Sequence, residues 1–166
     1  MNGLTSKLPT WQGLQLICMV FLLCSSFKVN AQISEVNTIQ NLSFGAFSHG
    51  SEGGTLTISN TGMRSATGTV VPVNLGYSYV QATFEIVAPN GTIISILNGP
   101  DAILSGSNGG TMSLRLGSSD PLSPFSVSSP TGKTEINIGG TLTLGPAATN
   151  PSGSYNGTFF ITFNNE

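Results

Sequence analysis

The sequence predicts an all-β fold of packed antiparallel sheets, and three observations carry that prediction. Apolar and polar residues alternate in short runs such as Val80–Ile86, which is typical of strands with one buried face. Turn-forming Asn, Gly and Pro residues separate these runs. After residue 31, no window supports a helix of about ten residues, so helical crossovers between parallel strands are not expected. We therefore expect an antiparallel immunoglobulin-like β-sandwich, with a jelly roll or a small barrel as the alternative.

The individual strands follow from the alternation. Val80–Ile86 has apolar residues at even positions and polar residues at odd positions, and Met112–Leu116 repeats this pattern. Tyr155–Phe163 has one apolar face, with Phe160 as the only large apolar residue on the other. Further runs expected as strands are Leu42–Phe47, Leu56–Ile58, Thr69–Asn74, Thr92–Leu97, Phe125–Val127 and Lys133–Leu144. Many short strands at this spacing predict a two-sheet sandwich.

A Gly-Gly-Thr phrase followed by alternating residues recurs along the chain. It begins at Gly53, Gly109 and Gly139. The unequal spacing argues against a solenoid of fixed period. In the third copy, a two-residue hairpin would leave Ile136 and Leu142 on opposite faces, whereas a continuous strand or a three-residue loop keeps them together. We expect one continuous strand over Lys133–Leu144, with Gly140 as a kink.

The first 31 residues are expected to form a signal-peptide helix that is removed on export. A basic start at Lys7, an apolar run over Leu14–Leu23 and a small residue at Ala31 have the order of a secretory signal. The apolar run is about half as long as a membrane span requires, so no membrane span is expected in the mature chain. Cleavage between Ala31 and Gln32 would leave residues 32–166 as a single β-sandwich domain.

Composition argues against several classes of partner. Both cysteines lie in the expected signal peptide, so the mature fold is expected without disulfides. Only Arg64, Arg115 and Lys133 remain as basic residues against seven acids, which gives the expected mature chain a formal net charge of −4. Such a surface cannot neutralise rows of phosphates, so neither nucleic acid nor an anionic membrane surface is an expected partner.

Several motifs, in their order and spacing, resemble a family of bacterial secreted proteins. They are Leu42–Phe47, Gly53–Ile58 followed by Gly62 and Arg64, Ile138–Leu142 and Gly153–Phe159. Together they resemble the family catalogued as a domain of unknown function, number four-four-zero-two, over nearly the whole mature chain. The Gly-x-Tyr-x-Gly-Thr ending is more loosely similar to the closing strand of spore-coat-U-like and chaperone-usher pilin subunits. This second resemblance implies an immunoglobulin-like fold and a role at the cell surface or in an appendage, and it transfers no catalytic residue.

A pilin-like assembly makes a demand that the sequence can test. Such subunits accept a strand from a neighbour's N-terminal extension, which places apolar residues at every second position. In residues 33–42 the apolar residues recur at every third position, so an extended donor would turn some of them to solvent. The expected strands are also numerous enough to complete a sandwich alone. We therefore expect a sandwich completed within one chain, with strict donor-strand assembly as the lesser alternative.

We expect no catalytic site, metal site or cofactor. The only histidine, His49, lies in a polar turn, where a solvated side chain is expected rather than a catalytic base or a metal ligand shared with Glu52. The sequence has no Gly-x-Ser-x-Gly nucleophile elbow. The acids lie in separate turns or on outward strand faces, which predicts neither a carboxylate pair for glycoside hydrolysis nor a calcium loop.

Exposed aromatic residues are the remaining candidates for a binding site. Tyr77, Tyr79 and Phe160 are off the alternating core face or beside a turn, and they are the tentative ligand platform, on which sugars would stack. The alternative is that the two tyrosines cover a sheet edge while Phe160 packs under a loop or in the second sheet. Arg64 is expected to cap a nearby carbonyl or to pair with a carboxylate.

The sequence therefore predicts an exported, non-catalytic structural or adhesive cell-surface protein, and a pilin-like subunit is one form that such a protein takes. The alternative is a glycan-binding module with the same β-sandwich. In either case we expect a secreted, periplasmic or cell-surface location. The expected partners are other copies of the chain, other surface subunits or surface glycans.

Overall fold

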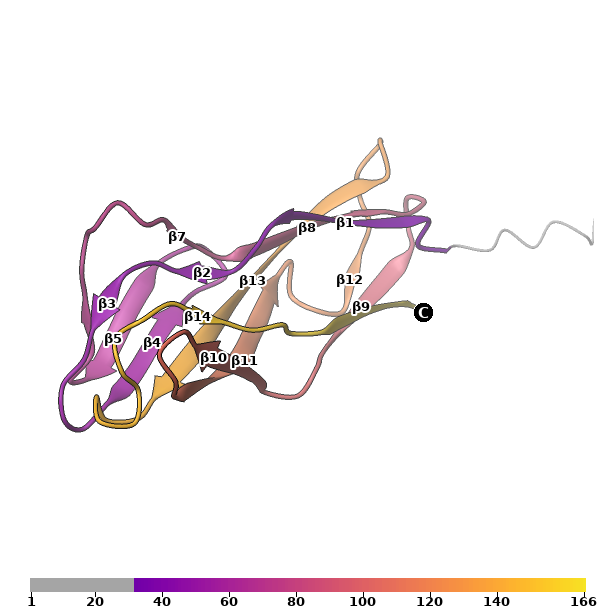
Figure 1. The fold of residues 1–166 in the computed structure, drawn as a ribbon. Helices are drawn as coiled ribbons and strands as arrows, with labels where there is room; N and C mark the ends of the chain where they lie inside the picture. The colour runs from indigo at the N-terminus through magenta and orange to yellow at the C-terminus, as the bar shows by residue number, and fades with distance from the viewer. Residues whose placement is uncertain (1–31) are drawn as a thin grey trace, which may run out of the picture. The chain divides into compact units, whose positions relative to one another are not determined.

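Residues 32–166, the part of the chain that the computed structural model describes, contain β-strands and connecting segments but no helix. The prediction of an all-β fold is therefore confirmed (Figure 1). Every ladder between named strands in this part of the chain is antiparallel, as expected. The expected signal-peptide helix, its last residue Ala31 and both cysteines lie outside the described residues. No helix able to span a membrane occurs within residues 32–166.

The larger layer is an eight-stranded sheet. Its strands follow the order β1–β8–β13–β11–β10–β14, and β4 pairs with the second half of β13 while β5 pairs with β4. The bounds are β1 Glu35–Gln40, β4 Gly54–Ile58, β5 Arg64–Gly68, β8 Ala82–Val87, β10 Ala102–Gly106, β11 Thr111–Asp120, β13 Lys133–Leu144 and β14 Tyr155–Asn156.

Strand β13 confirms the prediction of one continuous strand through the third Gly-Gly-Thr phrase. Its first half pairs with β8 and its second half with β4, while β11 runs along its other edge. The change of partner occurs at Gly139, where an added Cβ would collide with the Ile58 carbonyl oxygen. Gly140, the expected kink, instead sits in register with Leu116 and Ile58. The close backbone crossing therefore requires the first glycine of the pair.

The second layer consists of shorter pieces. A three-stranded sheet has the order β12–β9–β15, and two-stranded ladders join β2 to β7 and β3 to β6. The bounds are β2 Ser43–Phe44, β3 Phe47–Ser48, β6 Val71–Pro72, β7 Tyr79–Val80, β9 Ile93–Asn98, β12 Phe125–Ser126 and β15 Ile161–Asn165. The expected strand Thr69–Asn74 is thus reduced to two residues, and the expected single strand Tyr155–Phe163 is divided between β14 and β15.

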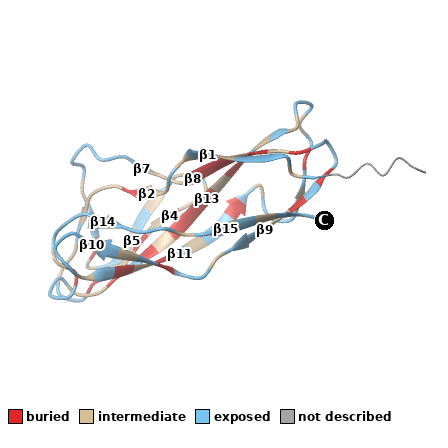
Figure 2. Ribbon diagram, turned by 45° about the vertical axis from the view of Figure 1, so that its right-hand side comes forward, coloured by how far each residue is buried: buried red, intermediate tan, exposed pale blue. Residues whose placement is uncertain are grey.

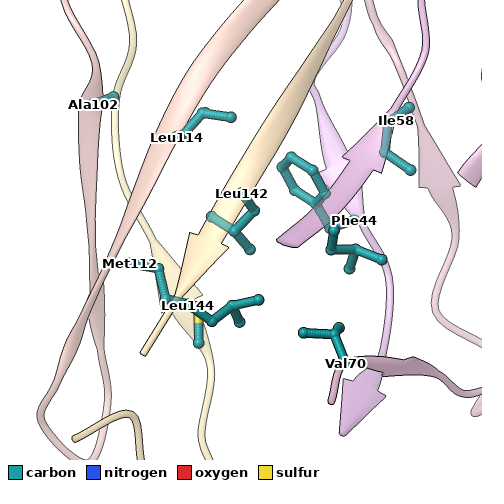
Figure 3. Close-up of a cluster of buried hydrophobic side chains, with 9 residues drawn as sticks. Phe44, Ile58, Val70, Ala102, Met112, Leu114, Leu142 and Leu144 are labelled. Atoms are coloured by element: carbon teal, nitrogen blue, oxygen red, sulfur yellow. The ribbon is translucent and has the colours of Figure 1, made fainter. Parts of the chain in front are cut away.

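The buried apolar residues form two clusters along β13, and Figure 2 shows buried positions on β8 and β13. The first cluster includes Phe44, Leu114, Leu142 and Leu144 (Figure 3), and the second includes Phe84 and Ile138. Ile96, Ile161 and Phe163 of the three-stranded sheet pack against the second cluster. The half-buried side chains of Leu42, Leu116 and Phe159 pack against both clusters. Alternation therefore identified the core face correctly.

Candidate functional site

A groove runs between an N-terminal segment, residues 36–49, and a C-terminal segment, residues 147–163. One section has a volume of about 790 Å³. At one end it is lined by Val36 and Phe163, and at the other by Leu42 and Phe159. The other section, of about 630 Å³, continues from Leu42 and Phe159 towards His49. Because both sections share Leu42, Phe159 and residues 156–157, we treat them as one groove.

Each wall of the groove is paired to the rest of the domain on one side. Along the N-terminal wall, β1 pairs with β8, β2 with β7 and β3 with β6. Along the C-terminal wall, β14 pairs with β10, and the Phe160 carbonyl accepts a hydrogen bond from the Gly99 N–H at 2.8 Å. No ladder joins the two walls, which Figure 1 shows running in opposite directions. Strand edges of this kind can accept a further strand.

The floor of the groove belongs to the inner face of the large sheet. Phe84 from β8 lies under one section, while Leu104, Leu114 and Leu142 lie under the other. Leu114 and Leu142 are core residues at 4% and 1% exposure, and Leu104 is half-buried. The section that ends at His49 therefore overlies the part of the first cluster that no strand of the three-stranded sheet covers, while the other section lies over Phe84 of the second cluster.

The lining of the groove is apolar or neutral. Among its lining residues there is no Asp, Glu, Lys or Arg, and the polar groups come from Asn, Ser, Thr and Tyr side chains and from His49. A buried charge without a partner is costly, so a neutral lining disfavours a charged occupant. The groove is therefore suited to apolar side chains and to uncharged backbone.

His49 closes one end of the groove and is half-buried, not solvated as the sequence predicted. Its Nε2 lies 3.1 Å from the Asn150 carbonyl oxygen, so Nε2 carries the proton that is donated. Its Nδ1 is buried without a hydrogen-bond partner. The nearby Glu52 is exposed, and residues 32–166 contain no group of three His, Cys, Asp or Glu side chains that could hold a metal ion.

Asn150, which the sequence did not single out, fixes the loop beside His49. Its side chain is 2% exposed, accepts a hydrogen bond from the Gly145 N–H at 2.6 Å and donates one to the Thr111 carbonyl at 2.7 Å. Buried amide side chains of this kind satisfy backbone groups that loops leave unpaired. An Asn-Pro pair signals only a turn, so burial of this residue had no signal in the sequence.

Arg64 holds the N-terminal wall by hydrogen bonds to its backbone carbonyls, so the prediction that it caps a nearby carbonyl is confirmed. Its guanidinium donates to the carbonyl oxygens of Phe44 and Ala46, both at 3.2 Å. It also lies over the Tyr79 ring, 4.1 Å from the ring centroid, which is a cation–π contact. One face of the Tyr79 ring is therefore already occupied.

The three aromatic residues of the expected platform lie on two different segments of the chain. Tyr77 and Tyr79 belong to the segment beside the N-terminal wall, whereas Phe160 belongs to the C-terminal wall. Tyr77 is 71% exposed and Phe160 is 70% exposed, and each lines a different section of the groove. The geometry thus relates two of the three residues to the groove.

The comparison with family models matches residues 33–164 to the family described as Domain of unknown function (DUF4402). No curated protein matches the chain, and no solved structure does so. The looser resemblance to spore-coat-U-like and pilin subunits stays a prediction. Since the matched region spans nearly all of the described residues, the chain belongs to the DUF4402 family.

Proposed function

We propose that this protein is a non-catalytic structural subunit of an exported surface assembly, and that it binds an extended segment of another polypeptide in the groove. On this view the domain is an immunoglobulin-like sandwich whose second layer lacks one strand, which departs from our expectation of a sandwich completed within one chain. The observation that carries the proposal is the groove itself, which has core side chains as its floor and singly paired segments as both walls.

Backbone pairing favours a polypeptide as the occupant. A strand between the walls would gain hydrogen bonds from backbone groups that β1–β3 and residues 156–163 do not use in their ladders with β8, β7, β6, β10 and β9. Strand addition of this kind takes its affinity from main-chain hydrogen bonds and its specificity from pockets for alternate side chains. A sugar or a small molecule would use few of these backbone groups.

Side-chain chemistry narrows the occupant further. Alternate residues of a bound strand would point to the floor, where Phe84, Leu104 and Leu142 offer apolar contact. The neutral lining disfavours charged side chains at these inward positions. The partner segment is therefore expected to be extended and uncharged, with apolar residues at every second position.

The occupant must come from outside the domain. Residues 35–40 are already β1, and the Ser34 N–H donates to the Val87 carbonyl at 2.8 Å. This segment therefore extends the large sheet at its edge and does not enter the groove. Another subunit of the same exported compartment is the proposed source, in keeping with the signal peptide that the sequence predicts.

Glycan binding is the second candidate, and the exposure of Tyr77 and Phe160 favours it. Their rings are accessible and lie beside the groove, which suits stacking on apolar sugar faces. Because Arg64 already stacks on one face of the Tyr79 ring, that face is not available to a sugar, and Tyr77 and Phe160 remain as the stacking residues. A glycan array probed with the mature chain should be negative if strand binding is the function.

Peptide binding to the mature chain tests the main proposal. The single tryptophan, Trp11, lies in the expected signal peptide, so a tryptophan placed in a peptide reports binding without background. We expect binding of an uncharged ten-residue peptide with alternating apolar residues, and none of a peptide of equal composition whose apolar residues are three apart. Equal binding of both peptides, or binding of neither, would contradict the proposal.

Two neighbouring positions of β10 provide a matched pair of variants. Leu104 lies in the groove floor, whereas Ile103 is 58% exposed on the other face of the strand. Leu104→Ser should weaken binding of the alternating peptide by about tenfold, which corresponds to roughly 1.4 kcal/mol. Ile103→Ser should leave binding unchanged, and circular dichroism of both variants checks that each is folded.

A further inference from the structure

The segment of residues 69–80, which we call the strap, runs along the outside of the N-terminal wall. It contains β6 and β7, which pair with β3 and β2. Most of its residues are exposed, and Figure 1 shows it as a long connection leading into β7. The strap is therefore joined to the wall of the groove, and Val70 is its one residue in the buried core.

Both ends of the strap are firmly held. At the first end, Thr69 Oγ1 donates to the Gly53 carbonyl at 2.9 Å, and the Val73 N–H donates to the Ala46 carbonyl at 3.0 Å. At the second end, Ser43 Oγ donates to the Ser78 carbonyl at 2.8 Å. The stacking of Arg64 on Tyr79 adds to this second anchor.

The tip of the strap, residues 74–77, is held much less firmly. The hydrogen bond within the tip joins the Gly76 N–H to Asn74 Oδ1 at 3.3 Å. Gly76 has a φ of +81° and open space around it, a backbone state that glycine adopts readily. Leu75 and Tyr77 flank it at 69% and 71% exposure, and both residues line the groove.

We infer that Leu75 and Tyr77 form a clamp that closes over a strand bound in the groove. This inference rests on the proposed function, since the clamp requires an occupant. Two large apolar side chains at the rim of an apolar groove gain free energy when a bound segment covers them. The anchored ends keep the tip beside the groove, and the glycine between the two side chains lets it adjust. Closure therefore slows dissociation of the occupant.

Exposure alone does not distinguish these residues from ordinary surface leucines, because isolated exposed apolar residues are common. Leu97 and Leu122 are similarly exposed, at 64% and 69%, but neither lines the groove. They are therefore matched controls for the loss of two exposed apolar side chains. The inference depends on the position of Leu75 and Tyr77 at the rim.

The test compares dissociation of the tryptophan-bearing alternating peptide from three mature chains. They are the unmodified chain, the Leu75→Ser/Tyr77→Ser double variant and the Leu97→Ser/Leu122→Ser control. We expect the rim variant to release the peptide at least about tenfold faster with little change in the association rate, as is usual for interface changes. The control should match the unmodified chain within about twofold. Acetylation of tyrosine hydroxyls, followed by mass spectrometry, should show that the peptide protects Tyr77.

The outcomes separate the clamp from the proposed function. If the unmodified chain binds no peptide, the proposed function fails, and the clamp fails with it. If the unmodified chain binds but the rim variant releases the peptide at the same rate, the clamp alone is overturned. Unchanged acetylation of Tyr77 in the complex would also overturn it, because a closed tip covers that side chain.

Discussion

Replacement of Gly139 by alanine should be among the most damaging small changes in this domain. At this residue β13 exchanges β8 for β4 as its partner. An added Cβ would collide with the Ile58 carbonyl oxygen and would lie 2.9 Å from the Asn60 nitrogen. All the nearest atoms are backbone, so no side chain can turn away and the strands themselves must separate. Overpacking costs about 1–3 kcal/mol, and a backbone obstacle places this case near the upper end, at about 3 kcal/mol.

Gly117, on the neighbouring strand β11, is the matched control. A Cβ there would meet nothing closer than 3.7 Å, which is ordinary van der Waals contact. Gly117→Ala should therefore be neutral or stabilise the fold by up to about 1 kcal/mol, because alanine restricts the unfolded chain. Urea unfolding of the mature chain, followed by circular dichroism, measures both variants. A free energy of unfolding for Gly139→Ala within about 1 kcal/mol of that for Gly117→Ala would refute the reasoning.

Three other predictions test the supports around the groove and the sheet edge. Arg64→Lys should lower the free energy of unfolding by about 1–2 kcal/mol in the same urea assay, because lysine cannot hold two carbonyls and stack flat on Tyr79. Asn150→Ala should cost about 2 kcal/mol or more, since it strands two backbone groups, and hydrogen exchange should rise in residues 145–151. Glu85 raises the pKa of Lys133 through a 2.9 Å ion pair, so this stabilisation is fully present below the ordinary lysine pKa of about 10.4 and is lost as pH rises through the raised pKa. In that alkaline window the melting temperature of Lys133→Met should fall less than that of the unmodified chain.

The strands of the core were predictable because alternation reports burial directly. In β8 and β13, the structure buries every apolar residue at an even position. Edge strands gave weaker signals. In β1 the register shifts between Thr38 and Gln40, so apolar residues three apart still fit a strand, and β5 is a mostly exposed strand with few apolar residues. Alternation of apolar and polar residues does not identify a strand where a bulge shifts the register or where both faces of the strand are exposed to solvent.

The groove was not predictable from the sequence, because it exists only where the N-terminal and C-terminal walls form no ladder with each other. The alternation over Tyr155–Phe163 is regular and predicts a single strand. In the structure, residues 157–160 connect β14 on the large sheet to β15 on the small one, without a ladder of their own. Gly157 allows this passage close to the Ile103 carbonyl, where a Cβ would lie 2.6 Å from the oxygen. Sequence patterns identify which side chains face the core, but not which segments stand opposite one another.

The same connecting segment, residues 157–160, explains why the section of the groove next to His49 lies over the first cluster. The long strand β13, with twelve residues, carries both clusters on the inner face of the large sheet. The three-stranded sheet packs against the second cluster. No residue of the three-stranded sheet packs against the first cluster, and the half-buried side chains of Phe47, Tyr155 and Phe159 pack against it from the two walls of the groove. Unpaired edges are an aggregation hazard that proteins usually mitigate with charge, and charged residues make up only 7% of this chain. An occupant that pairs with both walls would remove that hazard, so binding and solubility of the exported chain are expected to depend on the same groove.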